Sequence, residues 1–229
     1  MRRGPGFDLR QAGDAALMLA APEIIDPAIN EWCVAVAEAL RDTLGSALRD
    51  VVIGYCTVTV YFDPLSCDPR WLEEEVRSIA HGVNADEGTA GPTIEVPVCY
   101  GGEFGPDLED VAQFGGLSPD EAVAVHAGAT YRVFLVGFVP GFAYMAAVDP
   151  KIARPRRATP RTSVPPGSVA IAGGQTGVYP LATPGGWNIV GRTPVKPYDP
   201  TRAEPFLFRP GDQVRFRPID PSEFARLAQ

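Results

Sequence analysis

The stretch PRRATPRTSVPPGSVAIAGGQTGVYPLATPGGWNIVGRT, residues 155–193, sets the architecture of the second part of the chain. Prolines and glycines recur through it at short intervals, between runs of β-branched and small apolar residues. A helix interior does not tolerate this, because each proline removes a hydrogen bond and clashes with the preceding turn. Fifteen of the 24 prolines lie at or beyond Pro140. We therefore predict short strands joined by tight turns, most simply a closed or half-closed β-barrel.

The segment before this stretch adds strands and two short helices to the same domain. Residues 93–100 and 131–138 are rich in β-branched and aromatic residues, which is typical of strands. One short helix is expected near Asp107. A second begins at the capping box Ser118-Pro-Asp-Glu121, in which serine and glutamate satisfy the free N–H groups of the first turn, and runs to about His126.

The first part of the chain alternates strand and helix signals. Asp-Pro pairs at 26–27 and 68–69 are typical helix starts, and apolar residues follow each at helical spacing. Residues 14–20 predict a strand, and residues 51–62 predict one long strand. The pattern favours an α+β N-terminal domain over residues 1–88, followed by a mainly-β barrel domain over residues 89–229. A glycine-rich linker, residues 84–92, is the expected site of first proteolytic cleavage.

Composition narrows the function classes. The chain has 229 residues and a net charge of −8, which argues against a nucleic-acid partner. No run approaches the roughly 18 apolar residues of a membrane span, and no signal peptide is evident, so we expect a cytoplasmic protein. The four cysteines form no C-x-x-C pair and only two histidines exist, so we expect no metal site and interpret the cysteines as packing residues.

Positive charge is concentrated in one segment. No acid occurs between Pro150 and Tyr198, and that span holds seven bases: Lys151, Arg154, Arg156, Arg157, Arg161, Arg192 and Lys196. The pattern indicates either an anionic ligand or salt bridges to acids elsewhere in the chain. Arg161, held between prolines, is the predicted main contact for a carboxylate or phosphate, and Arg156 is the second.

Each of the other candidate residues has two interpretations, one functional and one purely structural. His126 is either a general acid or base or a histidine favoured by the end of its helix. Glu103 and Asp107 flank a glycine turn, where paired carboxylates could bind Mg²⁺ or transfer a proton. Asp107 is better explained as a helix N-cap, and Glu103 stays a candidate. Gly173 and Gly185 lie in turns that let backbone N–H groups approach an anion, or are simply tight corners.

Further polar and aromatic residues complete the predicted site. Gln175 and Thr183 stand beside glycine turns and are candidates to orient a ligand amide. Four aromatic residues are expected either to line a pocket or, as we favour, to seal one end of the barrel: Phe138, Phe142, Tyr144 and Trp187.

These segments together resemble a known family. PVCYGGEFGPDL (97–108), GFVPGFAY (137–144), the opening stretch and PGDQVRF (210–216) occur in the order and spacing of the KipI family, also called allophanate hydrolase subunit 1-like. The family includes the B subunit of the prokaryotic 5-oxoprolinase, and its relatives occur as fused domains in urea carboxylase.

The resemblance implies more than the residues show. It implies a cyclophilin-like barrel and a histidine at the place of His126. It implies one component of an enzyme that opens 5-oxo-L-proline to L-glutamate with ATP and Mg²⁺, inactive alone. The implied partners are a KipA-like companion and a LamB/YcsF-like companion, the C and A subunits of that enzyme. Alternatives are a KipI-type inhibitor of a sensor histidine kinase and a component of the allophanate or urea pathway.

Overall fold

The computed structural model describes residues 4–84 and 91–228. The chain divides into two compact units, residues 1–90 and residues 91–229, and each is described by itself. The expected boundary after residue 88 lies outside the described residues, as do residues 85–90 of the predicted linker.

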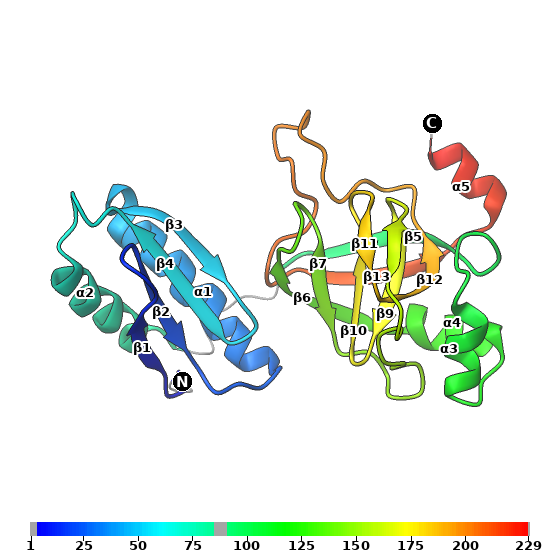
Figure 1. Ribbon diagram of the computed structural model, residues 1–229, viewed down its shortest axis with the longest axis horizontal. Coiled ribbons are helices and arrows are strands. Elements are labelled where there is room, and N and C mark those ends of the chain that lie inside the picture. Colours follow the sequence, from blue (N-terminus) through cyan, green and yellow to red (C-terminus); the bar gives the residue numbers. More distant parts are fainter. Residues whose placement is uncertain (1–3, 85–90, 229) are drawn as a thin grey trace. The chain divides into compact units, whose positions relative to one another are not determined.

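The first unit is a four-stranded antiparallel sheet with helices packed against it (Figure 1). The strand order is β1-β2-β4-β3, and helix α1 contacts β3, β4 and α2. The elements are β1 (Asp8–Gln11), β2 (Ala16–Ala20), α1 (Pro27–Leu44), the 3₁₀ turn η1 (Gly45–Ala47), β3 (Leu48–Ile53), β4 (Thr57–Phe62) and α2 (Pro69–Gly82).

Both predicted helix starts are confirmed. The Asp26 carboxylate accepts hydrogen bonds from the N–H groups of Ala28 at 2.7 Å and Ile29 at 3.4 Å. Asp68 caps α2 in the same way. The apolar stripe of α1 then packs on the sheet, where Val36 and Leu40 are fully buried.

The single strand predicted over residues 51–62 is wrong, because the chain turns back within it. The Gly54 N–H donates to the Thr57 carbonyl at 2.8 Å and closes a hairpin between β3 and β4. A Cβ atom at Gly54 would collide with the Thr57 hydroxyl, so this position of the turn favours glycine. β-branched residues lie on both sides of the turn, so the two strands look like one continuous strand in the sequence.

The second unit contains the predicted barrel. Seven strands close in the order β10-β7-β6-β13-β5-β12-β9; the β5–β13 pair is parallel and the other pairs are antiparallel. The barrel strands are β5 (Thr93–Tyr100), β6 (Thr130–Val136), β7 (Ala143–Ala146), β9 (Ser168–Ala172), β10 (Gln175–Val178), β12 (Asn188–Arg192) and β13 (Gln213–Pro218).

The remaining elements lie around the barrel. Strands β8 (Arg161–Val164) and β11 (Thr183–Gly185) form a two-stranded ribbon of their own. Helices α3 (Leu108–Phe114) and α4 (Pro119–Gly128) lie side by side at the barrel, and α5 (Pro221–Leu227) ends the described chain (Figure 1). The predicted capping box at the start of α4 is confirmed.

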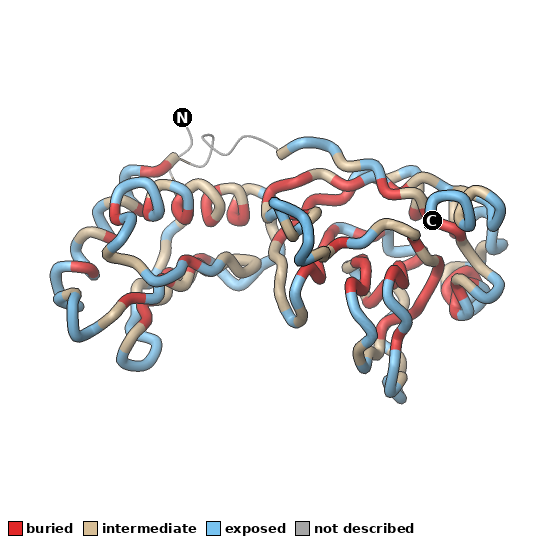
Figure 2. The backbone as a smooth tube through the Cα atoms, turned by 90° about the horizontal axis from the view of Figure 1, so that it is seen from above, coloured by how far each residue is buried: buried red, intermediate tan, exposed pale blue. Residues whose placement is uncertain are grey.

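Alternation along the barrel strands separates two apolar clusters, since successive strand residues point to opposite faces. Val169 and Ile171 of β9 join the large cluster, whereas Ala170 and Ala172 join a smaller one. The smaller cluster also takes Val164 from the β8–β11 ribbon. It therefore lies on the opposite face of β9 from the large core. Figure 2 shows the buried residues running along the barrel strands.

Candidate functional site

An aromatic pocket adjoins the smaller apolar cluster. Its volume is about 260 Å³. The walls are the side chains of Phe138, Phe142, Tyr144, Tyr179 and Trp187. Phe142 is the centre of these walls, with ring centroids 4.8 Å from Tyr144, 5.0 Å from Tyr179 and 5.3 Å from Trp187. The four aromatic residues singled out in the sequence thus line a pocket, and Tyr179 was missed.

Two backbone features shape this pocket. Phe138 has φ of 73°, a left-handed conformation that costs energy for a bulky residue, and its side chain is 63% exposed. Such strain concentrates at functional sites. At Gly185, a Cβ atom would collide with the Tyr179 hydroxyl, so the close approach of these two residues requires glycine. The predicted site residues Tyr144 and Gly185 both belong to the lining.

The charge in the pocket comes from Arg156. Its guanidinium carbon lies 5.9 Å from the centroid of the Trp187 ring, a cation–π arrangement. The other lining residues are the five aromatic residues, Pro160, Pro184, Gly185 and Gly186, so none of the described residues around the pocket is acidic.

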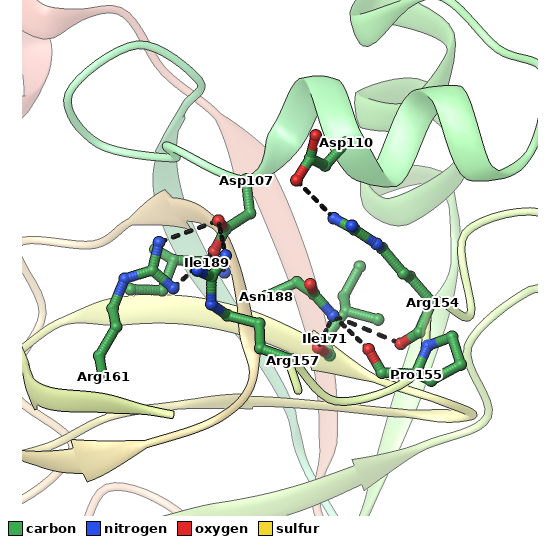
Figure 3. A network of polar contacts seen from close by, with 9 residues as sticks. All are labelled: Asp107, Asp110, Arg154, Pro155, Arg157, Arg161, Ile171, Asn188 and Ile189. Atoms are coloured by element: carbon green, nitrogen blue, oxygen red, sulfur yellow. Dashed lines mark hydrogen bonds and ion pairs between the residues drawn. The ribbon is translucent and has the colours of Figure 1, made fainter. Parts of the chain in front are cut away.

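The neighbouring arginines are neutralised within the unit (Figure 3). Asp107 is almost completely buried and accepts hydrogen bonds from Arg161 at 2.8 and 2.9 Å and from Arg157 at 2.8 Å. A fourth hydrogen bond, of 2.7 Å, comes from the Ile189 N–H. Burial by itself would raise the pKa of Asp107, but the bonds from Arg161 and Ile189 outweigh it and hold the pKa below its usual value.

This ion cluster corrects two interpretations of the sequence. Both terminal nitrogens of the Arg161 guanidinium donate to the Asp107 carboxylate. Arg161 is therefore not available as the main contact for an anionic ligand, the role that the sequence had predicted. Asp107 does occupy the N-cap position of α3, but its side chain makes no capping hydrogen bond. Three of the seven bases in the segment without acids, Arg154, Arg157 and Arg161, are thus paired with acids elsewhere in the chain, as one of the two open interpretations expected.

Hydrogen bonds hold the backbone on both sides of Arg156, and Figure 3 shows those from Asn188 to the backbone that precedes it. The Asn188 side-chain amide donates to the Pro155 carbonyl at 2.9 Å, and the Gly173 N–H donates to the Arg154 carbonyl at 2.8 Å. The Arg157 N–H donates to the Gly186 carbonyl at 2.8 Å. Arg154 itself pairs with Asp110 at 2.8 Å. These contacts anchor the chain immediately before and after Arg156.

The pocket tyrosines are neutral donors at physiological pH. Burial raises the pKa of Tyr144 and of Tyr179, although nearby Arg156 acts in the opposite direction. The Tyr179 hydroxyl also accepts a hydrogen bond from the Trp187 backbone N–H. The pocket therefore combines one cation, hydroxyl groups and aromatic faces.

His126 lies in the packed interior instead of the pocket. It is 1% exposed, and its ring stacks on Phe216 at 4.7 Å. Its Nδ1 lies 2.8 Å from the Tyr100 hydroxyl and its Nε2 lies 2.9 Å from the Thr176 hydroxyl. Burial lowers the pKa of His126 to about 3. This environment favours the structural interpretation, because the imidazole is enclosed and both of its nitrogens already have hydrogen-bond partners.

The other predicted site residues are dispersed. Glu103 is exposed on the turn after β5. Gly173, with φ of 57°, forms the corner between β9 and β10, and Gln175 begins β10. Thr183 is on β11 opposite Val164. None of these four belongs to the lining of the aromatic pocket.

Potential metal ligands do not gather in the described part of the chain. Among residues 4–84 and 91–228, no cluster of three or more histidine, cysteine, aspartate or glutamate residues is arranged to hold a metal ion. The four cysteines are free thiols. Within the described helices, none has the length and apolar character needed to cross a membrane.

The fold defines a carboxyltransferase-like domain protein. Residues 7–208 match the family model described as carboxyltransferase domain, subdomain C and D. The crystal structure of TTHA0988 superposes with a TM-score of 0.80 at 37% identity, covering 93% of this chain and 40% of that one. This chain thus spans less than half of that structure. K. lactis urea amidolyase shares the fold at a TM-score of 0.76 and 19% identity, covering 97% of this chain and 15% of that one.

Sequence similarity narrows the class. A curated protein of Bacillus subtilis (strain 168), named as the B subunit of 5-oxoprolinase, is 36% identical over 95% of this chain and 95% of its own length. The chain therefore belongs to the carboxyltransferase C and D domain family, within the group that contains the B subunit of 5-oxoprolinase.

Proposed function

We propose that this protein is one component of an ATP-dependent 5-oxoprolinase, which opens 5-oxo-L-proline to L-glutamate together with companion subunits. The observation that carries the proposal is the 36% identity to the B subunit of a 5-oxoprolinase over 95% of both chains. The fold shared with K. lactis urea amidolyase, at 19% identity, supports the architecture and not a urea substrate.

The chemistry explains why companions are needed. Opening a lactam requires activation of an amide that is a poor leaving group, and ATP supplies this through a phosphorylated intermediate. Stabilising phosphoryl charge takes guanidinium or ammonium groups, backbone N–H groups and usually Mg²⁺. In the described part of this chain, Arg157 and Arg161 are committed to Asp107, and His126 is buried.

ATP does not suit the aromatic pocket. Pockets for drug-sized ligands span about 300–1,000 Å³, whereas this one is about 260 Å³ and carries one guanidinium group. We therefore assign ATP and Mg²⁺ to the assembled complex. The proposed companions are a KipA-like protein and a LamB/YcsF-like protein, which would supply the C and A subunits of the enzyme.

The test is reconstitution. The chain is purified alone and after co-expression with its two proposed companions, and ATP turnover is measured with and without 5-oxo-L-proline. We expect substrate-dependent turnover and glutamate release only from the complete complex. Omission of each component in turn is the control. Substrate-dependent turnover by the lone chain would reject a shared site, whereas a complex with a sensor histidine kinase instead would favour the KipI-type inhibitor.

A further inference from the structure

We propose that the aromatic pocket of the barrel unit binds a compact carboxylate with a small ring, its carboxylate on Arg156 and its ring against the aromatic walls. This is a property of this chain by itself. Only the identification of that carboxylate with 5-oxo-L-proline rests on the proposed function.

Arg156 gives the pocket an unneutralised positive charge. Four arginines lie between residues 154 and 161, and three of them are paired: Arg154 with Asp110, and both Arg157 and Arg161 with Asp107. Within the described residues, Arg156 has no carboxylate partner, and no acid lines its pocket. An anionic ligand would therefore meet a guanidinium whose hydrogen-bonding fork is free to bind a carboxylate.

The aromatic walls of the pocket determine what kind of molecule can carry the anionic group. Inorganic phosphate is hydrated on all sides and gains nothing from aromatic faces, whereas five rings surround this pocket. A small, partly apolar ring can pack on them and replace water. The volume of about 260 Å³ limits the ligand to a small molecule. A small ring that carries one carboxylate meets all three conditions.

The site is also organised before a ligand arrives. Hydrogen bonds from Asn188 and Gly173 hold the backbone before Arg156, and the bond between Arg157 and Gly186 holds it after. Phe138, which also lines the pocket, is kept in a left-handed conformation. A ligand would thus order little of the protein on binding, which favours affinity.

The experiment titrates the full chain with small molecules and monitors binding by NMR. The signal is that of the Trp187 indole N–H, which is assigned by its loss in a Trp187→Phe variant. The probes are 5-oxo-L-proline, its uncharged primary amide, cyclopentanecarboxylate and inorganic phosphate. We expect both carboxylates to shift the Trp187 signal saturably. We expect the amide and phosphate to bind at least about 10-fold more weakly, the scale of a lost charged hydrogen bond.

Variants separate the pocket from the general charge of the surface. Arg156→Gln should weaken both carboxylates by about 10-fold or more, Arg156→Lys should weaken them less, and exposed Arg215→Gln on β13 should change nothing. The proposal is overturned if neither carboxylate binds at Trp187, if the amide or phosphate binds as well, or if Arg156→Gln binds like the natural chain. Binding of cyclopentanecarboxylate alone keeps the pocket and rejects its link to 5-oxo-L-proline, whatever the activity of the complex.

Discussion

Both ring nitrogens of His126 are in use, and their partners define the tautomer. The Thr176 hydroxyl donates its only proton to the Ala170 carbonyl at 3.1 Å, so it accepts from Nε2–H of His126. Nδ1 then accepts from the Tyr100 hydroxyl. A neutral imidazole satisfies both hydroxyl groups, and a protonated one cannot, since it would have no acceptor left for Tyr100.

We predict that His126→Ala destabilises the protein by about 2–4 kcal/mol, because it leaves a cavity and two buried hydroxyl groups with a lost partner. Chemical denaturation measures this. His81→Ala, at the other histidine, which is exposed, is the control and should cost less than about 1 kcal/mol. An unchanged free energy of unfolding for His126→Ala would contradict the structural role.

The same residue predicts a pH signature. The pKa of His126 is about 3 in the folded protein and 6.5 in the unfolded chain, so the unfolded chain binds the proton more readily. Its stability contribution is complete above pH 6.5 and is lost as the pH falls towards 3, by up to about 1.4 kcal/mol per pH unit. Between pH 6.5 and 5 the natural chain and His81→Ala should show this slope, and His126→Ala should lose it.

At the level of single elements, α3 is anchored by an ion cluster instead of a local cap. Asp107, at its N-terminus, accepts hydrogen bonds from Arg157, which precedes β8, and from Arg161, the first residue of β8. It also accepts one from the backbone of β12. One carboxylate thereby ties a helix, the β8–β11 ribbon and a barrel strand together. Asp110, one turn later in the same helix, pairs with Arg154 near the surface.

We predict different costs for the two aspartates of α3. Asp107→Asn should destabilise the protein by about 2–3 kcal/mol. This lies at the low end of the cost of breaking a buried ion pair, because both arginine partners are partly exposed. Asp110→Asn removes the same charge from a side chain that is 52% exposed and should cost less than about 1 kcal/mol. Thermal and chemical denaturation at pH 7 compare them. Equal losses would show that the Asp107 cluster adds nothing beyond a surface pair.

Across the full chain, each unit has an apolar core of its own. The core of the first unit lies between residues 17 and 83, and both clusters of the second unit lie between residues 96 and 216. The barrel closes on itself through the β9–β10 pair and needs no strand from the first unit.

We therefore predict that residues 91–229 fold when expressed without the first unit. The isolated unit should unfold cooperatively and keep the dispersed NMR spectrum of a packed barrel, including the Trp187 indole signal. The full chain is the reference. A spectrum typical of an unfolded chain would show that the barrel core depends on residues 1–90.

Features that depend on near neighbours were predictable from the amino-acid sequence. The aspartate caps, the capping box and the helical stripes belong to this group, because their hydrogen bonds and contacts join residues within about four positions. Proline and glycine density predicted a barrel, since it excludes helices over a long stretch. The hairpin at Gly54 is the local exception, because β-branched residues flank it on both sides.

The role of each charged residue became clear only from the folded chain. Arg156 and Arg161 have the same neighbours in the sequence, a proline and further basic or polar residues, and the pattern ranked Arg161 first. Asp107 lies 54 positions from Arg161, and the partners of His126 are 26 and 50 positions away. Closing the barrel brings these groups together. Whether each side chain is buried or paired, and therefore its charge state and its access to a ligand, depends on residues far away in the sequence, which no local pattern encodes.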